Sequence, residues 1–254
     1  QRRGRMSRLE HFRGHEDFIA RLEDMLAACE RQNRVIFTPF LSESEGRIVE
    51  QVCGKSRLQR SWGGYAHAQR RCYALLPVEM DIEFPVCVLK ASYQPRFGRL
   101  THRDVLGAFM HQGIDRAQLG DILIEENEIY VMALEPISAY LIDQVTMIRR
   151  SGLRFSRYAG VPDIAPRVQR RECNVSSLRL DAIVSAICRI SRARAASLIE
   201  GGMVKVNDLP LEQCSALCDN NCAVSVRGHG RFQFVGVQKM TKKNRYVIEI
   251  LVYC

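Results

Sequence analysis

The order of strand-like and helix-like segments between residues 84 and 158 most narrowly limits what this chain can fold into. Alternating apolar and polar residues indicate strands, whereas apolar residues three and four positions apart indicate helices. Here the segments follow the order β-α-β-β-α-β, which is that of the split βαβ or ferredoxin-like fold. The predicted strands are residues 84–93, 121–124, 129–134 and 153–158, and the predicted helices begin near Thr101 and Pro136.

The sheet of this middle domain, expected at residues 80–160, offers few aromatic side chains to a nucleic acid. RNA-recognition modules share its element order and stack bases on aromatics of a K/R-G-F/Y-G/A-F-V-x-F/Y strand. The matching strand, 128–133, contains only Tyr130. We therefore expect an RRM-like fold without the usual stacking platform. Contacts to RNA backbone, to protein, or to neither remain open for this domain.

Residues 14–79 are expected to form a separate small α+β domain. Apolar residues of 16–31 share one helical stripe, and Ser42 with Glu45 has the form of a capping box that opens a second helix. Strands are expected at 58–62 and 72–76. The preceding residues 1–13 are expected to be a basic, flexible lead-in.

The charge of the chain favours a polyanionic partner. The formal net charge is +9 and the pI about 9.2, and a basic protein gains affinity for nucleic acid by releasing phosphate counterions. No run of 18 apolar residues and no secretory signal is apparent, so we expect a cytoplasmic protein with reduced cysteines. The spacing of Cys214, Cys218 and Cys222 lacks an evident fourth ligand, so ordinary cysteines are favoured over a metal site and no cofactor is expected.

Residues 174–254 are expected to form a third domain, after a basic, proline-containing linker at 161–173. Apolar spacing predicts a helix through Leu180 and Ile187, and Ser191 is a suitable N-cap for a second helix that ends at Gly201. Strands are expected at 204–206, 223–226, 232–237 and 246–252, with a turn at Asn207. The fold class of the whole chain is thus α+β, with two short helices and a small twisted sheet at its C-terminal end.

Basic residues outnumber acidic ones in this last domain. Residues 174–254 contain eleven Lys and Arg against six Asp and Glu. On a helical wheel Arg192 and Arg194 flank the apolar stripe of the second helix, and Arg189 lies in the turn before it. The first amides of that helix point outward beside Ser191, where a phosphate group fits, and a guanidinium binds phosphate oxygens through two parallel hydrogen bonds. The pattern favours a phosphate-binding surface over a merely solvated helix face.

A series of motifs in the same region resembles the S4 RNA-binding domain. It contains R-L-D, then S-R-x-x-A, then L-I-x-x-G-x-V-x-V-N, at residues 179–181, 191–195 and 198–207. Further segments resemble the bacterial YlmH proteins over nearly the whole chain, and that family also places its S4 domain at the C-terminus. These segments are residues 63–65, 100–108, 113–116, 119–123 and 225–231.

The resemblance implies binding of structured RNA through the helix pair and a role with the large ribosomal subunit in ribosome-associated quality control. The family is similar in role to the short S4 protein that steadies peptidyl-tRNA while a stalled nascent chain receives an untemplated tail. The expected partners are large-subunit rRNA, with tRNA and a quality-control protein as further candidates, and a monomer is expected. The expected RNA-binding residues are Arg179, Arg189, Ser191, Arg192, Arg194, Lys205, Asn207, Arg227, Arg231, Lys242 and Lys243.

One segment departs from the family pattern. Residues 210–222 lack the glycine–acid pair that usually turns the S4 sheet before its last strands. Asp219-Asn220-Asn221 is expected to supply this turn, because asparagine tolerates left-handed geometry.

Two other functions remain open besides this non-enzymatic one. S4 domains accompany pseudouridine synthases, where an R-L-D motif carries a catalytic aspartate, and rRNA methyltransferases. Here no glycine precedes Arg179, Asp181 suits a helix first turn, and no Gly-rich nucleotide loop is present. His102 and Asp104 suggest acid–base chemistry, but packing at a helix start is favoured. The other alternative is an interaction scaffold linked to cell division.

Overall fold

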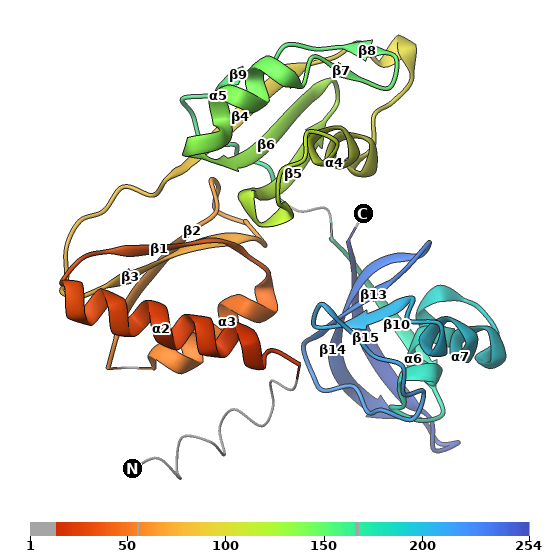
Figure 1. Cartoon of the computed structure of the whole chain (residues 1–254). Coiled ribbons are helices and arrows are strands. Elements are labelled where there is room, and N and C mark those ends of the chain that lie inside the picture. The colour runs from red at the N-terminus through yellow and green to blue at the C-terminus, as the bar shows by residue number, and fades with distance from the viewer. Residues whose placement is uncertain (1–13, 55, 166–167, 254) are drawn as a thin grey trace. The chain divides into compact units, whose positions relative to one another are not determined.

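The computed structural model describes residues 14–54, 56–165 and 168–253 and divides into two units, Gln1–Ile164 and Ala165–Cys254 (Figure 1). The lead-in expected at 1–13 lies outside the described residues. Each unit combines helices with its own antiparallel sheets, as the predicted α+β class requires. Among the residues described, no helix has both the length and the apolar character needed to cross a bilayer.

The first part of unit 1 packs two helices on one three-stranded sheet (Figure 1). The expected capping box is present, because Ser42 accepts from the amide of Glu45 and the Glu45 carboxylate accepts from the amide of Ser42. Gly54 caps the other end of that helix. The elements are α2 (Glu16–Gln32), β1 (Ile36–Leu41), α3 (Glu43–Cys53), β2 (Leu58–Trp62) and β3 (Arg71–Leu76), with sheet order β1-β3-β2.

Strand β1 was not expected from the sequence, because proline interrupts a strand pattern. Pro39 has no amide hydrogen to donate to a neighbouring strand, and such residues are confined to edge strands and bulges. Here β1 is an edge strand, and its pairing with β3 shifts register between Phe37 and Phe40, around the proline. The structure therefore accommodates Pro39 at a bulge.

The second part of unit 1 confirms the predicted β-α-β-β-α-β order. Its sheet has the order β5-β6-β4-β9, with β6 placed between the strands of the first βαβ crossover. The predicted helix start at Thr101 is a capping box with Asp104, and Pro136 lies in the first turn of α5. The elements are β4 (Val86–Ser92), η2 (Pro95–Phe97), α4 (His102–Met110), η3 (Arg116–Gln118), β5 (Leu119–Glu125), β6 (Glu128–Leu134), α5 (Glu135–Gln144), β7 (Met147–Ile148), β8 (Ser151–Gly152) and β9 (Ser156–Arg157).

The two sheets of unit 1 are joined by a shared apolar cluster and a carboxylate clamp. Phe40 and Tyr65 from the first sheet region pack with Met132 of β6. Asp121 of β5 accepts hydrogen bonds from the Tyr65 hydroxyl at 2.9 Å and from the amides of Gln69 and Arg70 at 2.6 and 3.2 Å. Burial is the main cause that raises the pKa of Tyr65 above its ordinary value, and the neighbouring Asp121 carboxylate raises it further. The Tyr65 hydroxyl therefore keeps its proton and donates a hydrogen bond to Asp121.

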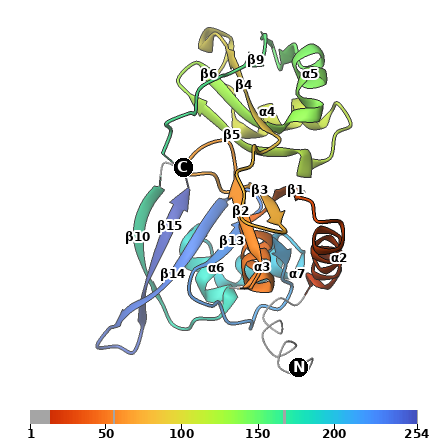
Figure 2. The same ribbon diagram turned by 90° about the vertical axis from the view of Figure 1, so that its left-hand side faces the viewer.

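Unit 2 consists of two short helices and a six-stranded antiparallel sheet (Figure 2). Its core combines Ile183, Ile187 and Ile199 from the helices with Phe234 and Ile248 from the sheet. The elements are β10 (Val168–Val175), α6 (Leu180–Cys188), α7 (Arg192–Glu200), β11 (Val204–Val206), β12 (Leu209–Pro210), β13 (Cys222–Val226), β14 (Gly230–Met240) and β15 (Tyr246–Tyr253). The sheet order is β10-β15-β14-β13-β11-β12.

The linker expected at 161–173 is wrong in its second half. Residues from Val168 onward form β10, which pairs in continuous register with β15 from Val168–Tyr253 to Val175–Tyr246. The sequence of β10 resembles a linker because its exposed arginines and other polar residues show no alternation of apolar and polar positions, as an exposed edge strand allows. The turn expected from asparagine is present, since Asn221 has a φ of 63° immediately before β13.

Candidate RNA-binding surface

The helices α6 and α7 are joined by a short connection that is held at both ends. Arg189 caps α6 in the left-handed region, and Ser191 caps α7, where its hydroxyl oxygen accepts from the amide of Arg194 at 3.2 Å. The Ser185 hydroxyl donates to the carbonyl oxygen of Ile190 at 2.6 Å. These bonds fix the N-terminus of α7 against α6, with the positive end of the α7 dipole beside Ser191.

A buried aspartate binds two of the predicted arginines. Asp181, in the first turn of α6, is only 7% exposed. Its Oδ1 and Oδ2 accept from Nε and Nη2 of Arg179 at 3.2 and 3.3 Å, and Oδ2 accepts from Nη2 of Arg192 at 2.7 Å. The side chains of Arg179 and Arg192 remain 44% and 46% exposed. Asp181 thus fixes two guanidinium groups whose other donors face solvent.

The charge of this group is set by the arginines. Burial alone would raise the pKa of Asp181, but the hydrogen bonds from Arg179 and Arg192 outweigh burial and lower it below its ordinary value. The carboxylate is therefore ionised at neutral pH, and the three side chains together carry a net charge of about +1. The sequence pattern predicts Asp181 in a helix first turn but does not predict its contacts with the two arginines.

The other predicted basic residues divide into two groups. Arg189 and Arg194 are exposed on the same helix pair as Arg179 and Arg192, and Lys205 is exposed on β11. The remaining four lie on two hairpins. Arg227 precedes β14, where its guanidinium approaches the Met203 sulfur, and Arg231 lies at the start of β14. Lys242 and Lys243 are exposed in the β14–β15 turn.

Two of the predicted RNA-binding residues are engaged within the sheet. The side-chain oxygen of Asn207 accepts from the amide of Ala223 at 3.0 Å, and the Asn207 backbone is left-handed at φ 50°. Arg231 lies 3.8 Å from Asp208 and its side chain is 28% exposed. Asn207 therefore shapes the turn between β11 and β12 and fastens it to β13.

Sequence patterns did not point to Ser176 or Arg245. The Ser176 hydroxyl lies 3.4 Å from Nη1 of Arg192, and Arg245 donates to the carbonyl oxygen of Asn174 at 3.3 Å. Both contacts join residues at least 16 positions apart. No local spacing rule could have found them, because they arise only when β10 lies beside α7 and β15.

The aromatic side chain predicted on the sheet of the middle domain is mostly covered. Tyr130 is 8% exposed, its ring meets Tyr158 edge-on, and its hydroxyl donates to Glu128. Lys90 lies 5.1 Å from the centre of the Tyr130 ring. On the same strand Met132 is covered by Phe40 and Tyr65. Tyr130, the one aromatic residue of β6, is therefore mostly covered by its neighbours within the domain.

The residues considered for catalysis or metal binding have structural contacts. Asp104 accepts from the hydroxyl and amide of Thr101, and these bonds lower its pKa. The Cys214 sulfur lies 3.6 Å from a Glu200 oxygen. A hydrogen bond to Cys222, followed by burial, raises the pKa of the Cys218 thiol. Among the residues described, no three His, Cys, Asp or Glu side chains are grouped as metal ligands.

Comparisons with known proteins agree with the resemblance found in the sequence. Residues 78–159 match a family described as "Putative RNA-binding domain in YlmH". The chain is 28% identical over 246 residues to "Ribosome-associated protein quality control protein P2" of Bacillus subtilis, covering 93% of this chain and 95% of that protein. A solved structure, "Cell division protein ylmH from Streptococcus pneumoniae", shares the fold with a TM-score of 0.52 at 20% identity, over 59% of this chain and 94% of that one. The predicted resemblance to the YlmH proteins is confirmed.

Proposed function

We propose that this relative of the YlmH proteins is an accessory factor of the large ribosomal subunit that binds rRNA through its α6–α7 surface. Unit 2 supplies the helix pair and small sheet that the S4-like motifs imply. The matched RNA-binding family covers residues 78–159 in unit 1, so both units would contribute to binding RNA.

The observation that carries this proposal is the pair of arginines held by Asp181. A flexible arginine must be ordered when it binds phosphate, and that ordering costs roughly 0.5–1.5 kcal/mol for each long side chain. Arg179 and Arg192 are ordered in advance by bonds of 2.7–3.3 Å to one buried carboxylate. The first amides of α7 belong to the same helix turn as Arg192, and Arg194 adds an exposed guanidinium on the other edge of that helix, so a folded RNA would meet several donors at once.

The biological setting follows from the relatives. The curated relative is named as a ribosome-associated quality control protein, and we assign this chain the same process, with stalled nascent chains as its substrate. Peptidyl-tRNA is the proposed second ligand, and a quality-control protein a further partner. The protein would act in the cytoplasm as a monomer without catalysis. Gene deletion should then remove no modified nucleotide from rRNA, as measured by mass spectrometry.

The direct test replaces two exposed arginines of α7. Arg192→Ala with Arg194→Ala should weaken co-sedimentation with large subunits and reduce the salt slope of binding by about two, one for each lost phosphate contact. The matched control is Arg31→Ala with Arg34→Ala, which removes the same charge from exposed positions in the first unit. Equal binding by the wild type and the α7 variant would contradict the proposal.

A further inference from the structure

A two-residue turn in the middle domain is built from two arginines. Strands β7 and β8 pair Ile148 with Ser151, so Arg149 and Arg150 alone form the turn. Arg149 has a φ of 54°, in the left-handed region that hairpin turns usually give to glycine or asparagine. Such strained backbone is often retained at functional positions.

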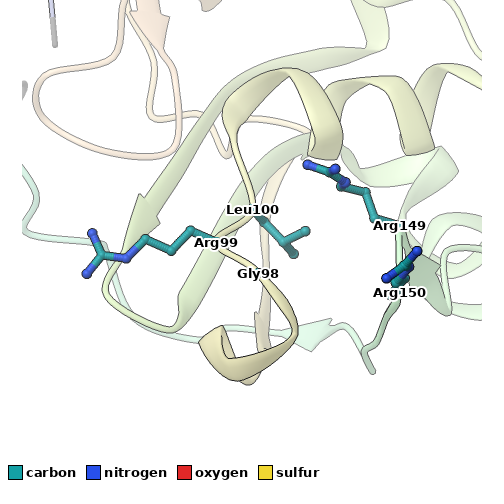
Figure 3. A pocket seen from close by; sticks show the side chains of 5 residues that line it. All are labelled: Gly98, Arg99, Leu100, Arg149 and Arg150. Carbon is teal, nitrogen blue, oxygen red and sulfur yellow. The ribbon is translucent and has the colours of Figure 1, made fainter.

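The turn forms one wall of a basic cavity of about 280 Å³. Figure 3 shows Arg149 and Arg150 on one side of Leu100 and Arg99 on the other, with Arg99 extending away from the first two. Nη1 of Arg149 lies 3.5 Å from Asp104, and the Arg149 side chain stays 65% exposed. The residues that line this cavity include three arginines and no acid.

A second cavity, of about 440 Å³, is lined by the next residues of the same two segments. Ser151 and Gly152 follow the arginine turn, and Gln94 and Arg96 precede Gly98 of the first cavity. Its remaining lining consists of Ser92, Tyr93 and Asn127, of which Asn127 lies in the β5–β6 turn. Because the same two segments line both cavities in direct succession, the cavities are neighbours at one end of the sheet.

Ser151 gives an independent indication of a ligand. It is 3% exposed, lines the larger cavity, and its hydroxyl has no hydrogen-bond partner among the described residues. Buried polar groups in proteins are almost always bonded, so an unpartnered one calls for an explanation. Because Ser151 lines the cavity, a molecule bound there would lie next to a hydroxyl whose hydrogen-bonding capacity is unused within the described residues.

We propose that these adjoining cavities bind one nucleotide of a single-stranded RNA segment. Arg149 and Arg150 would bind its phosphate, while Ser151 and Asn127 would hydrogen-bond its sugar or base. A cavity of 440 Å³ lies near the lower end of the roughly 300–1,000 Å³ range of ligand pockets, which suits one nucleotide unit. The inference deepens the proposed binding of RNA but uses a surface separate from α6 and α7.

The test uses the full chain and a fluorescent eight-nucleotide single-stranded RNA, with binding followed by anisotropy. Arg149→Gly with Arg150→Asn removes both guanidinium groups and places glycine at the turn position that has a positive φ, so the fold is retained. The dissociation constant should rise about tenfold, and the salt slope should fall by roughly 1.4, or 0.7 for each lost phosphate contact on a single strand. Unchanged affinity and slope would overturn the inference.

Ser151→Ala examines the polar cavity on its own. The dissociation constant for the octamer should rise about fivefold, while the melting temperature stays equal or increases, because an unpartnered buried hydroxyl is removed. The matched control is Ser156→Ala, at an exposed serine of β9. A Ser151 variant that binds the octamer like the wild type would remove this residue and its cavity from the proposed site.

Two further measurements separate this site from the proposed function. The Arg192→Ala, Arg194→Ala variant should lose structured rRNA binding and keep octamer binding, whereas the Arg149→Gly, Arg150→Asn variant should do the reverse. Failure of the first expectation alone would contradict the α6–α7 proposal and leave the nucleotide site standing. Mononucleotides that compete as well as the octamer would instead identify a free-nucleotide site, which contradicts binding of an RNA strand.

Discussion

Replacing Asp181 with asparagine separates the effect of charge from the effect of fixed geometry. The change removes one negative charge next to the proposed phosphate contacts, so simple electrostatics predicts tighter RNA binding. It also releases Arg179 and Arg192, which Asp181 holds at 3.2–3.3 and 2.7 Å. The two effects act in opposite directions, and their magnitudes decide the outcome.

The magnitudes favour weaker binding. A phosphate on the far side of a guanidinium lies about 7 Å from the carboxylate, where removing one charge in water-like surroundings gains about 0.6 kcal/mol. Reordering two freed arginines costs roughly 0.5–1.5 kcal/mol each. The net loss is about 0.4–2.4 kcal/mol, which corresponds to a roughly 2- to 60-fold rise in dissociation constant.

Anisotropy of a labelled structured rRNA fragment, between 50 and 200 mM salt, measures both quantities that matter. Asp181→Asn should lower affinity with no reduction in salt slope, because the same arginines still reach phosphates. Arg192→Ala should lower affinity and reduce the slope by about one. Tighter binding by Asp181→Asn would refute the argument that fixed geometry determines affinity here.

Three further predictions concern stability, each measured by urea or thermal unfolding. Gly63→Ala should destabilise the fold by more than about 2 kcal/mol, since its Cβ would lie 2.2 Å from a neighbouring side-chain carbon. Gly107→Ala, in open space on α4, should stabilise the fold by up to ~1 kcal/mol. Equal effects of the two substitutions would contradict the packing around Gly63. Asp121→Ala should destabilise by about 2–3 kcal/mol, because two amides and the Tyr65 hydroxyl lose their acceptor. Because the folded pKa of Asp181 is depressed, its contribution is present above the unfolded pKa of about 4 and is lost as pH falls further, so Asp181→Asn should flatten only the acid limb of the stability curve.

Local chemistry explains why much of the fold could be predicted. The capping boxes at Ser42 and Thr101 and the left-handed Asn221 turn depend on residues within a few positions of each other. Elements whose sequence contradicts their environment were missed. Strand β1 was missed because Pro39 interrupts its pattern, and the structure accommodates this proline at a bulge. Strand β10 was missed because it is an exposed edge strand whose arginines give it the composition of a linker.

In the candidate site, too, the features set by local sequence could be predicted, and the contacts between distant residues could not. Exposure of Arg192 and Arg194 follows from helical periodicity, and the cap at Ser191 follows from residue type. The shared carboxylate of Asp181 joins residues 11 positions apart in two helices, and no helical spacing within one element predicts it. Asn207 fits the family motif, yet its side chain serves the fold.

The clamp at Asp121 bears on how this protein can be divided for experiments. A fragment that starts at residue 78, where the matched RNA-binding family begins, would lack Phe40 and Tyr65, which cover Met132. It would also lose all three donors to Asp121. Such a fragment would expose an apolar strand face that is covered in the full chain. Self-association or nonspecific RNA binding by the fragment would therefore result from the truncation and would not describe the native domain.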